Sequence, residues 1–227
     1  GILLHEILEK IDFTRVADER TKSLVIETLE KFGYPRPWQE GIGRMLQNLV
    51  QTKLPAGDGK AFCLSQIAPA QCLRELEFYF PLQSLSPAKL LSVLESEKAR
   101  ERRTLHFPPV QGFLKGFIDM LFEYEGRFYL TDWKSNDLGG HPENYAPDGL
   151  RREMMRSFYD VQYLIYTVAV DAYLKARKPN YTYDRDFGGV FYFFLRGLAA
   201  SPETGGVFFD RPDEAFIGRL RDALLAT

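Results

Sequence analysis

Gly116-Phe-Ile-Asp-Met-Leu-Phe-Glu-Tyr-Glu-Gly-Arg-Phe-Tyr-Leu-Thr-Asp-Trp-Lys-Ser-Asn136 is the stretch of this sequence that decides the expected fold. It predicts two apolar strands, over about 113–124 and 127–134, joined by a Glu-Gly turn. Asp119 lies on the first strand, and Asp132 lies near the end of the second. The stretch therefore brings two carboxylates to neighbouring strands of one sheet.

The triplet Asp132-Trp133-Lys134 adds a cation to this pair of acids. Residues two apart on a strand project from the same face, so Asp132 and Lys134 are expected side by side. Asp119 and Asp132 are candidate Mg²⁺ ligands, and the Trp133 backbone carbonyl would add another oxygen. The Lys134 ammonium would orient or help to deprotonate a water that attacks a phosphodiester, and would stabilise the pentavalent transition state.

The triplet has an alternative interpretation without any function, because acid-x-Lys sequences are common on exposed strand faces. The context favours a metal site instead. The triplet follows a strongly apolar run, Phe128-Tyr-Leu130, and a second acid lies on the adjacent apolar strand. A buried-side Asp needs a partner or a metal.

Composition indicates a globular protein with a real core. The chain has 227 residues, of which 45% are hydrophobic and 14% aromatic, enough for one ample domain. No run of 18 apolar residues is present, so no membrane span is expected. The first residues lack an initiator Met and a signal-peptide pattern, so we expect a fragment of a longer chain. Two cysteines, Cys63 and Cys72, are too few for a disulfide framework, which favours a reducing, intracellular setting.

The charge balance is slightly acidic, with a formal net charge of −2. Such a balance argues mildly against a non-specific nucleic-acid binder. Basic residues gather locally at 98–103 and at 151–156. Each gathering is either a solvated helix face or a DNA contact.

The other segments predict helices and strands intermixed around an apolar sheet. Helices are expected over 2–10, 21–32, 38–51, 87 to about 102, 152–177 and 213–225. Strands are expected over 72–82, 188–195 and 207–209, with turn-rich loops over 55–59 and 136–148. The fold class is therefore α/β, with a central sheet flanked by helices and an N-terminal helical portion. We expect one domain over 1–227, with a mainly helical lead-in over 1–70 and a core over 71–210.

Several segments together resemble a known family. The stretch Gly116-Phe-Ile-Asp119 followed by Tyr129-Leu-Thr-Asp132-Trp-Lys134-Ser-Asn resembles the nuclease motif of the RecB family, within the PD-(D/E)xK phosphodiesterase superfamily. Gly1-Ile-Leu-Leu-His5 is similar to the N-terminal helix of that family, Gln162-Tyr-Leu-Ile-Tyr166 to its QxxxY motif, and 189–197 to the following strand. The resemblance runs from residue 1 to about residue 210 and is closest to the C-terminal nuclease domain of RecBCD-type helicase–nucleases.

This resemblance implies a restriction-endonuclease-like core and assigns roles to three further residues. His5 would be a metal ligand beside Asp119 and Asp132. Gln162 and Tyr166 would contact DNA or brace the site. From the residues alone, a lone histidine in an apolar segment, such as His5, is usually a core or surface histidine whose hydrogen bonds are satisfied. Tyr166 is equally compatible with core packing. Gln162 and Tyr166, four residues apart, share one helix face.

The resemblance also implies an activity. It is that of a Mg²⁺-dependent deoxyribonuclease of the exodeoxyribonuclease V type, with Ca²⁺ or Mn²⁺ as substitutes in the site. Its substrate would be mainly single-stranded DNA, cleaved to 5′-phosphate products in double-strand break repair and recombination. Its partners would be the helicase and accessory subunits of a RecBCD-like complex and a recombinase, with no membrane, in a bacterial cytoplasm. No GxxxxGK[ST] motif is present, so no ATP site is expected.

Two alternatives remain for the function, and other polar residues have open roles. The chain is alternatively a catalytically silent DNA-channel or subunit-docking module, or a stand-alone endonuclease of the same fold. Glu75 and Glu77 share a strand face and either approach the metal through water or are simply exposed. His106 and His141 are expected at the surface, and Asp137 is expected to cap the next segment.

Overall fold

The computed structural model describes residues 1–57, 59–95, 106–198 and 205–225. The helices are α1 (Ile2–Lys10), α2 (Glu19–Lys31), α3 (Trp38–Gln51), α4 (Pro87–Leu94), α5 (Pro147–Arg156), α6 (Tyr159–Arg177), α7 (Tyr183–Asp186), α8 (Leu195–Leu198) and α9 (Glu214–Leu224). The strands are β1 (Leu54–Pro55), β2 (Ala61–Phe62), β3 (Cys72–Leu85), β4 (Val110–Tyr124), β5 (Arg127–Lys134), β6 (Phe187–Phe194) and β7 (Val207–Asp210).

A five-stranded mixed sheet organises the molecule, with the order β3-β4-β5-β6-β7. Strands β3, β4 and β5 pair antiparallel in sequence, β5 pairs parallel with β6, and β7 is antiparallel to β6. The parallel β5–β6 pair requires a crossover, which α5, α6 and α7 supply. The predicted α/β class with a central mixed sheet, flanking helices and an N-terminal helical portion is confirmed.

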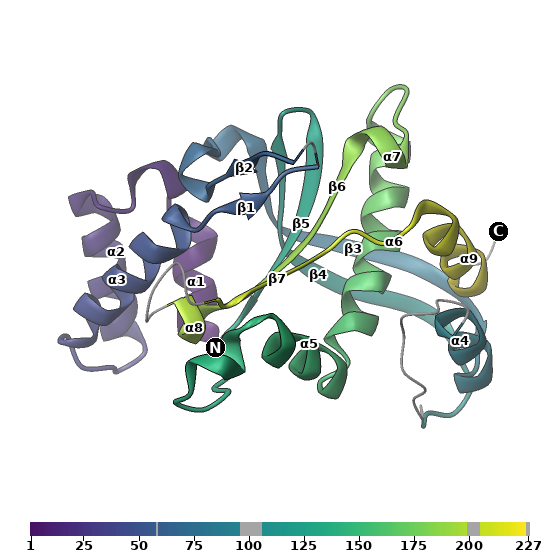
Figure 1. The fold of residues 1–227 in the computed structure, drawn as a ribbon, viewed down its shortest axis with the longest axis horizontal. Coiled ribbons are helices and arrows are strands. Elements are labelled where there is room, and N and C mark those ends of the chain that lie inside the picture. The colour runs from purple at the N-terminus through teal and green to yellow at the C-terminus, as the bar shows by residue number, and fades with distance from the viewer. Residues whose placement is uncertain (58, 96–105, 199–204, 226–227) are drawn as a thin grey trace.

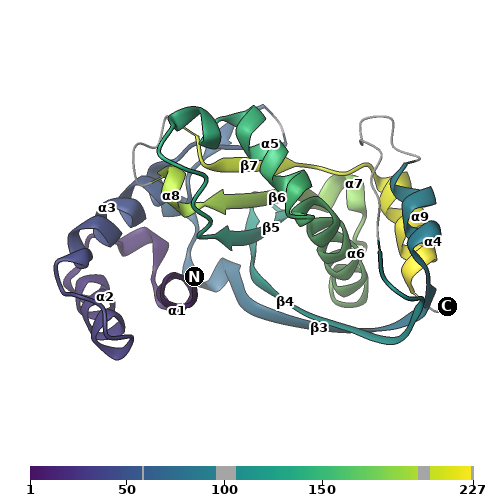
Figure 2. The same ribbon diagram turned by 90° about the horizontal axis from the view of Figure 1, so that it is seen from below.

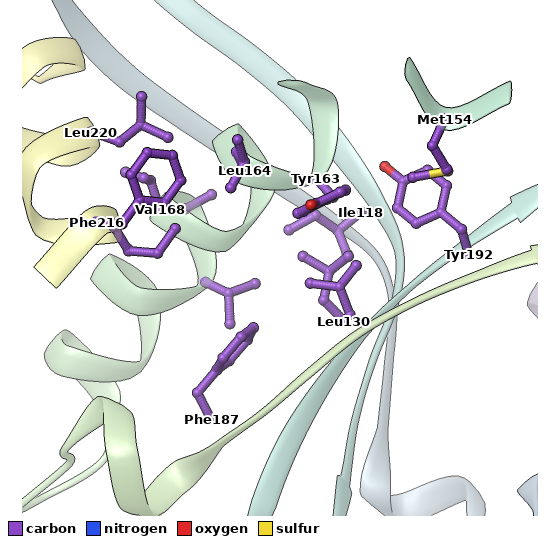
Figure 3. Close-up of a cluster of buried hydrophobic side chains, with 14 of the residues drawn as sticks. Ile118, Leu130, Met154, Tyr163, Leu164, Val168, Phe187, Tyr192, Phe216 and Leu220 are labelled. Carbon is purple, nitrogen blue, oxygen red and sulfur yellow. The ribbon is translucent and has the colours of Figure 1, made fainter. Parts of the chain in front are cut away.

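Two apolar cores lie on opposite faces of this sheet. One packs α6 and α9 against the sheet, through residues such as Leu164, Val168 and Phe216, and Figure 3 shows part of it. The other packs α1, α2 and α3 against Trp133 and Phe193. In Figure 1 the N-terminal helices lie at one end of the sheet and α6 and α9 at the other. All eight residues of β6 are buried, because both faces of that strand are covered.

Strands β4 and β5 separate close to the two acids, Asp119 and Asp132. The β4–β5 ladder ends at the pair Met120–Thr131, whereas β5 continues beside β6 as far as Lys134. On the N-terminal side of Met120, β4 is paired with β3 alone, and we call this two-stranded segment the β3–β4 arm. Figure 2 shows the β3–β4 arm curving away from β5. Asp119 is therefore the first residue of β4 past the split.

One predicted helix is wrong in its extent. The segment 152–177 forms two helices, α5 and α6, separated by Phe158 in a left-handed conformation with φ 56°. The apolar periodicity passes through this break without a Gly or Pro to mark it, so the sequence predicted one continuous helix. Helix α5 also begins earlier than expected, with Pro147 at its first position.

Other predicted elements agree with the structure to within a few residues. The predicted loop over 55–59 lies between the short paired strands β1 and β2, which the sequence did not predict. Helix α4 ends at Leu94, with Glu95 as its C-cap. Residues 96–102 of its predicted range and the basic residues at 98–103 lie outside the described residues. No helix in the described part of the chain has the length and apolar character to cross a membrane.

Candidate metal and phosphodiester site

Asp119 occupies the fork between β4 and β5. Its Oδ2 accepts a hydrogen bond from the Trp133 backbone N–H at 2.7 Å. That amide lies past the end of the β4–β5 ladder, so the Asp119 carboxylate takes the place of the missing strand partner. The side chain of Asp119 is 13% exposed, so it keeps some contact with solvent.

Asp132 lies almost fully buried on the adjoining strand. Its Oδ2 is 2.7 Å from Lys134 Nζ, and its side chain is 6% exposed. Burial, opposed in part by Lys134, raises the pKa of Asp132 to about 7, with Asp119 repulsion adding to the effect. A cation beside this carboxylate would relieve the cost of its buried charge.

His5 reaches the same fork from α1. Its Nε2 is 2.9 Å from the Trp133 carbonyl oxygen, and its Nδ1 is 3.5 Å from Asp119 Oδ1. The hydrogen bond with Asp119 raises the pKa of His5 against the opposing effect of burial. Residues 128 apart in the sequence thus meet at one point, and the predicted ligands His5, Asp119 and Trp133 lie together.

Arg74 on β3 fixes the helix that carries His5. Its guanidinium donates hydrogen bonds to the backbone carbonyls of Glu9 and Ile11, at the C-terminal end of α1. It also lies 5.0 Å from the ring centroid of Phe13. Arg74 therefore holds α1 against the sheet, a positioning role that the sequence did not predict.

Lys134 is held in a cage of polar and aromatic groups. Its Nζ donates to Gln162 Oε1 at 3.0 Å and lies 3.9 Å from the ring centroid of Tyr159 and 5.0 Å from that of Tyr192. The side chain is 12% exposed. With Asp132 on one side and two π faces around it, the ammonium has a fixed direction.

The QxxxY pair braces this cage. Gln162 Nε2 donates to the Tyr166 hydroxyl at 2.9 Å, while Gln162 Oε1 also accepts from the Tyr192 hydroxyl at 3.1 Å. Tyr166 packs edge-on against Phe78 of β3, with ring centroids 5.5 Å apart. Both side chains therefore link α6 to the catalytic lysine candidate and to the β3–β4 arm.

Tyr159, Tyr192 and Asn136 are site residues that sequence reasoning missed. Asn136 Nδ2 donates to the Tyr159 hydroxyl at 3.0 Å and lies 3.3 Å from Glu153 Oε1. A signal for Tyr159 was present, because it precedes Gln162 by three residues and shares its helix face. Tyr192 gave none, since every residue of its strand is apolar in character.

Glu75 and Glu77 separate in the structure. The β3–β4 register places Glu75 between the pairs Arg74–Met120 and Leu76–Ile118, opposite Asp119. Partial desolvation and the Asp119 charge raise the pKa of Glu75, so it belongs to the field of the site. Glu77 instead pairs with Lys115 at 2.6 Å.

The predictions for three other polar residues have different outcomes. His106 and His141 are exposed. Asp137 Oδ1 accepts from the Gly139 backbone N–H in a local turn, whereas His141 is the N-cap residue of the next helical segment, Pro142–Tyr145. The prediction that Asp137 caps that segment is therefore wrong.

The donor set fits a divalent cation, because Asp132 Oδ2 is buried without a hydrogen-bond partner in the described part of the chain, although Lys134 Nζ lies 2.7 Å away. Among the residues described, no three His, Cys, Asp or Glu side chains are already arranged as a metal-binding group. His5 faces the Trp133 carbonyl and Lys134 faces Asp132. Two carboxylates and a carbonyl oxygen are nevertheless ligands suited to Mg²⁺ or Mn²⁺, and the His5 imidazole adds a nitrogen donor of the kind that transition-metal ions accept. The buried Asp132 also favours a nearby positive charge.

A mixed sheet flanked by helices, with acids at the point where two strands diverge, defines an α/β protein of the restriction-endonuclease-like class. No family model matches the chain. The chain is similar to proteins named RecBCD enzyme subunit RecB, with 35% identity in Haemophilus influenzae over 223 residues, 97% of this chain and 18% of the relative. It is 34% identical to the Escherichia coli protein over 229 residues, 100% of this chain and 19% of the relative.

A more distant relative of the same name, from Mycobacterium tuberculosis, is 29% identical over 260 residues, or 99% of this chain and 23% of the relative. These similarities confirm the relationship to the RecB family that the motifs indicated. The chain spans about a fifth of the length of these relatives.

Proposed function

We propose that this chain is a Mg²⁺-dependent deoxyribonuclease of the RecB type that hydrolyses phosphodiester bonds, mainly in single-stranded DNA. One observation carries the proposal. His5, Asp119 and Asp132 converge at the fork between β4 and β5, with the Lys134 ammonium directed at Asp132. The similarity to RecB supports the assignment, because it covers the segments that supply all four residues.

His5, Asp119, Asp132 and the Trp133 carbonyl would hold the cation. When bound, it would supply charge stabilisation at the scissile phosphate and lower the pKa of a bound water. Asp119 keeps its orientation through the Trp133 amide, and His5 keeps its own through Asp119 and the Trp133 carbonyl. These contacts fix the positions of the ligand atoms before any substrate arrives, which is the condition for electrostatic preorganisation.

Lys134 would act on the water and on the phosphate. Gln162, Tyr159 and Tyr192 limit the positions open to its ammonium. From there Nζ would orient the attacking water, help to remove its proton, and donate to the non-bridging oxygen that gains charge in the transition state. The expected products carry 5′-phosphates.

The setting of this activity is part of the same proposal. The relatives are subunits of RecBCD enzymes, so helicase and accessory subunits of such a complex would deliver the DNA strand in a bacterial cytoplasm, in double-strand break repair and recombination. A recombinase is a further proposed partner. The net charge of −2 agrees with a domain that receives its strand from other subunits, because its own field would hold DNA weakly.

Degradation of end-labelled single-stranded DNA in low salt with Mg²⁺ tests the function. Wild-type protein is expected to cleave the strand, and Asp132→Ala is expected to be inactive. Asp222→Ala is the matched control, because Asp222 is 67% exposed on α9 and pairs with Arg221, so this variant should retain full activity. Equal cleavage by wild type and Asp132→Ala would refute the site, and inactivity of wild type within its full complex would favour the silent docking module.

A further inference from the structure

The β3–β4 arm carries exposed aromatic side chains on the side away from α6. We call Tyr79, Phe113 and Phe117 the aromatic face; their exposed fractions are 59%, 61% and 46%. The alternate residues of the same strands, such as Phe78 and Ile118, are buried in the core with α6. In Figure 2, α6 lies on one side of the arm, and no described helix or strand covers its other side.

Two rings of this face stack on one another, and the third lies beside a lysine. Tyr79 and Phe113 stack with centroids 4.6 Å apart and an interplanar angle of 13°. Lys115 Nζ lies 5.2 Å from the Phe117 ring centroid and 2.6 Å from Glu77 Oε1. An apolar patch that remains exposed generally marks an interaction site. Here the rings lie beside a paired lysine and glutamate, and exposed Pro81 lies opposite Phe113.

The aromatic face continues directly into the fork. Phe117 precedes Asp119 by two residues on β4, and Phe113 precedes it by six. Six residues of strand span about 20 Å, the length of about six nucleotides of stacked single strand. Glu75, at the end of the same run of exposed β3 residues, interacts electrostatically with Asp119 and His5. A single strand of DNA lying along this face would therefore reach the candidate catalytic residues without turning.

We propose that the aromatic face is a base-stacking subsite that holds single-stranded DNA on one side of the scissile phosphate, an inference that rests on the proposed nuclease function. Flat rings accept any base, so the subsite is independent of sequence. Bases in a duplex are already stacked and cannot use it, which gives the nuclease a preference for single strands. The paired Lys115 and Glu77 add little net charge, so the contribution of the rings persists at high salt.

Binding of fluorescein-labelled oligo(dT) in EDTA tests this subsite without requiring cleavage. The double variant Tyr79→Ala/Phe113→Ala is expected to bind about 10-fold or more weakly than wild type, since each base–aromatic stack carries roughly a 5-fold to 100-fold effect. The loss should persist at high salt. Tyr79→Phe/Phe113→Tyr keeps both rings and should restore binding.

The chain offers a matched control in Tyr34 and Trp38, a second exposed aromatic pair with ring centroids 4.9 Å apart, beside α3 and outside the site. Tyr34→Ala/Trp38→Ala should bind oligo(dT) as wild type does. An equal loss in this control, or unchanged binding by the Tyr79/Phe113 double variant, would overturn the proposal. Unchanged DNA binding combined with lost binding to a helicase subunit would reassign the face to protein docking.

Kinetics with Mg²⁺ separate the subsite from the nuclease function. For wild type, kcat/KM should rise with oligo(dT) length until the face is filled, and this rise should disappear in the Tyr79→Ala/Phe113→Ala variant. Hydrolysis of the p-nitrophenyl ester of thymidine 5′-phosphate by wild type reports the phosphodiesterase chemistry with a single base. If wild type leaves both substrates intact within its full complex as well, the proposed function fails, while the binding measured in EDTA still decides the subsite.

Discussion

Asp132 and Lys134 show how two side chains of one strand set the chemistry of a site. Burial of the Asp132 carboxylate removes it from water, which disfavours its charged form. Lys134, at 2.7 Å, partly compensates for the lost hydration. The ammonium is fixed by Gln162 and the rings of Tyr159 and Tyr192 rather than by Asp132 alone. Metal binding and water activation are therefore assigned to different residues, and substitutions should separate them.

Removing the Lys134 ammonium should abolish cleavage and leave metal binding in place. Lys134→Ala eliminates the donor directed at the developing charge, for which losses of about 10²–10³-fold in kcat are typical. Ca²⁺ affinity should be kept, because no ligand is lost and the ammonium removed lies beside Asp132, where it opposes the binding of another cation. Calorimetry and single-turnover cleavage measure the two effects, and a variant that cleaves DNA at the wild-type rate would contradict the role.

The raised pKa of Asp132 predicts a destabilised metal-free protein at neutral pH. The folded state binds this proton more tightly than the unfolded state, with a pKa of about 7 against 3.8. The free energy of unfolding contributed by this group therefore falls as pH rises from about 4 to about 7. In EDTA at pH 8, Asp132→Asn should melt at or above the temperature of wild type, and the difference should vanish near pH 4. Thermal unfolding followed by circular dichroism measures this difference. If the melting temperature of wild type rose relative to that of the variant as the pH increased, the raised pKa of Asp132 would be contradicted.

At the scale of elements, the β3–β4 arm depends on a contact across its two strands. Gly116 pairs with Phe78, and a Cβ at Gly116 would lie 2.4 Å from the Phe78 ring. That ring also packs against Tyr166 and Phe80. The glycine of the Gly-Phe-Ile-Asp motif thus allows an aromatic ring to cover the arm and to support the helix that holds Gln162.

Gly116→Ala should therefore destabilise the fold by about 1–3 kcal/mol, a usual cost of forcing an extra group into a packed region. Its matched control is Gly218→Ala in α9, where no heavy atom lies within 4 Å of the added Cβ. That change should be neutral or stabilise the protein by up to about 1 kcal/mol. Urea unfolding of both variants measures the difference, and equal stabilities would show that the Phe78 contact is unimportant.

The elements differ in how far sequence could predict them. The apolar strands around Asp119 and Asp132 were predictable because their periodicity and the Glu-Gly turn agree. The break at Phe158 was not, since a left-handed residue other than glycine leaves no compositional mark. The divergence of β4 from β5 was also hidden, because it depends on pairing across the sheet and not on either strand alone.

For the whole molecule, the site is a product of tertiary packing. Local spacing predicted that Asp132 and Lys134 share a face. It did not reveal that Arg74 would hold α1 in place, or that Tyr159 and Tyr192 would enclose the lysine. His5 was accessible through the family resemblance alone, because 128 residues separate it from Trp133.

Calorimetric titration of Ca²⁺ into metal-free wild type, His5→Ala, Asp119→Ala and Asp132→Ala tests the central claim most directly, with Asp222→Ala as control. Ca²⁺ serves as the probe because it accepts the same oxygen ligands as Mg²⁺. We predict saturable binding to wild type and the control, affinity lowered by an order of magnitude or more in all three site variants, and weaker wild-type binding below pH 7, where Asp132 gains a proton. Wild-type affinity in both Asp119→Ala and Asp132→Ala would contradict a metal site at this fork.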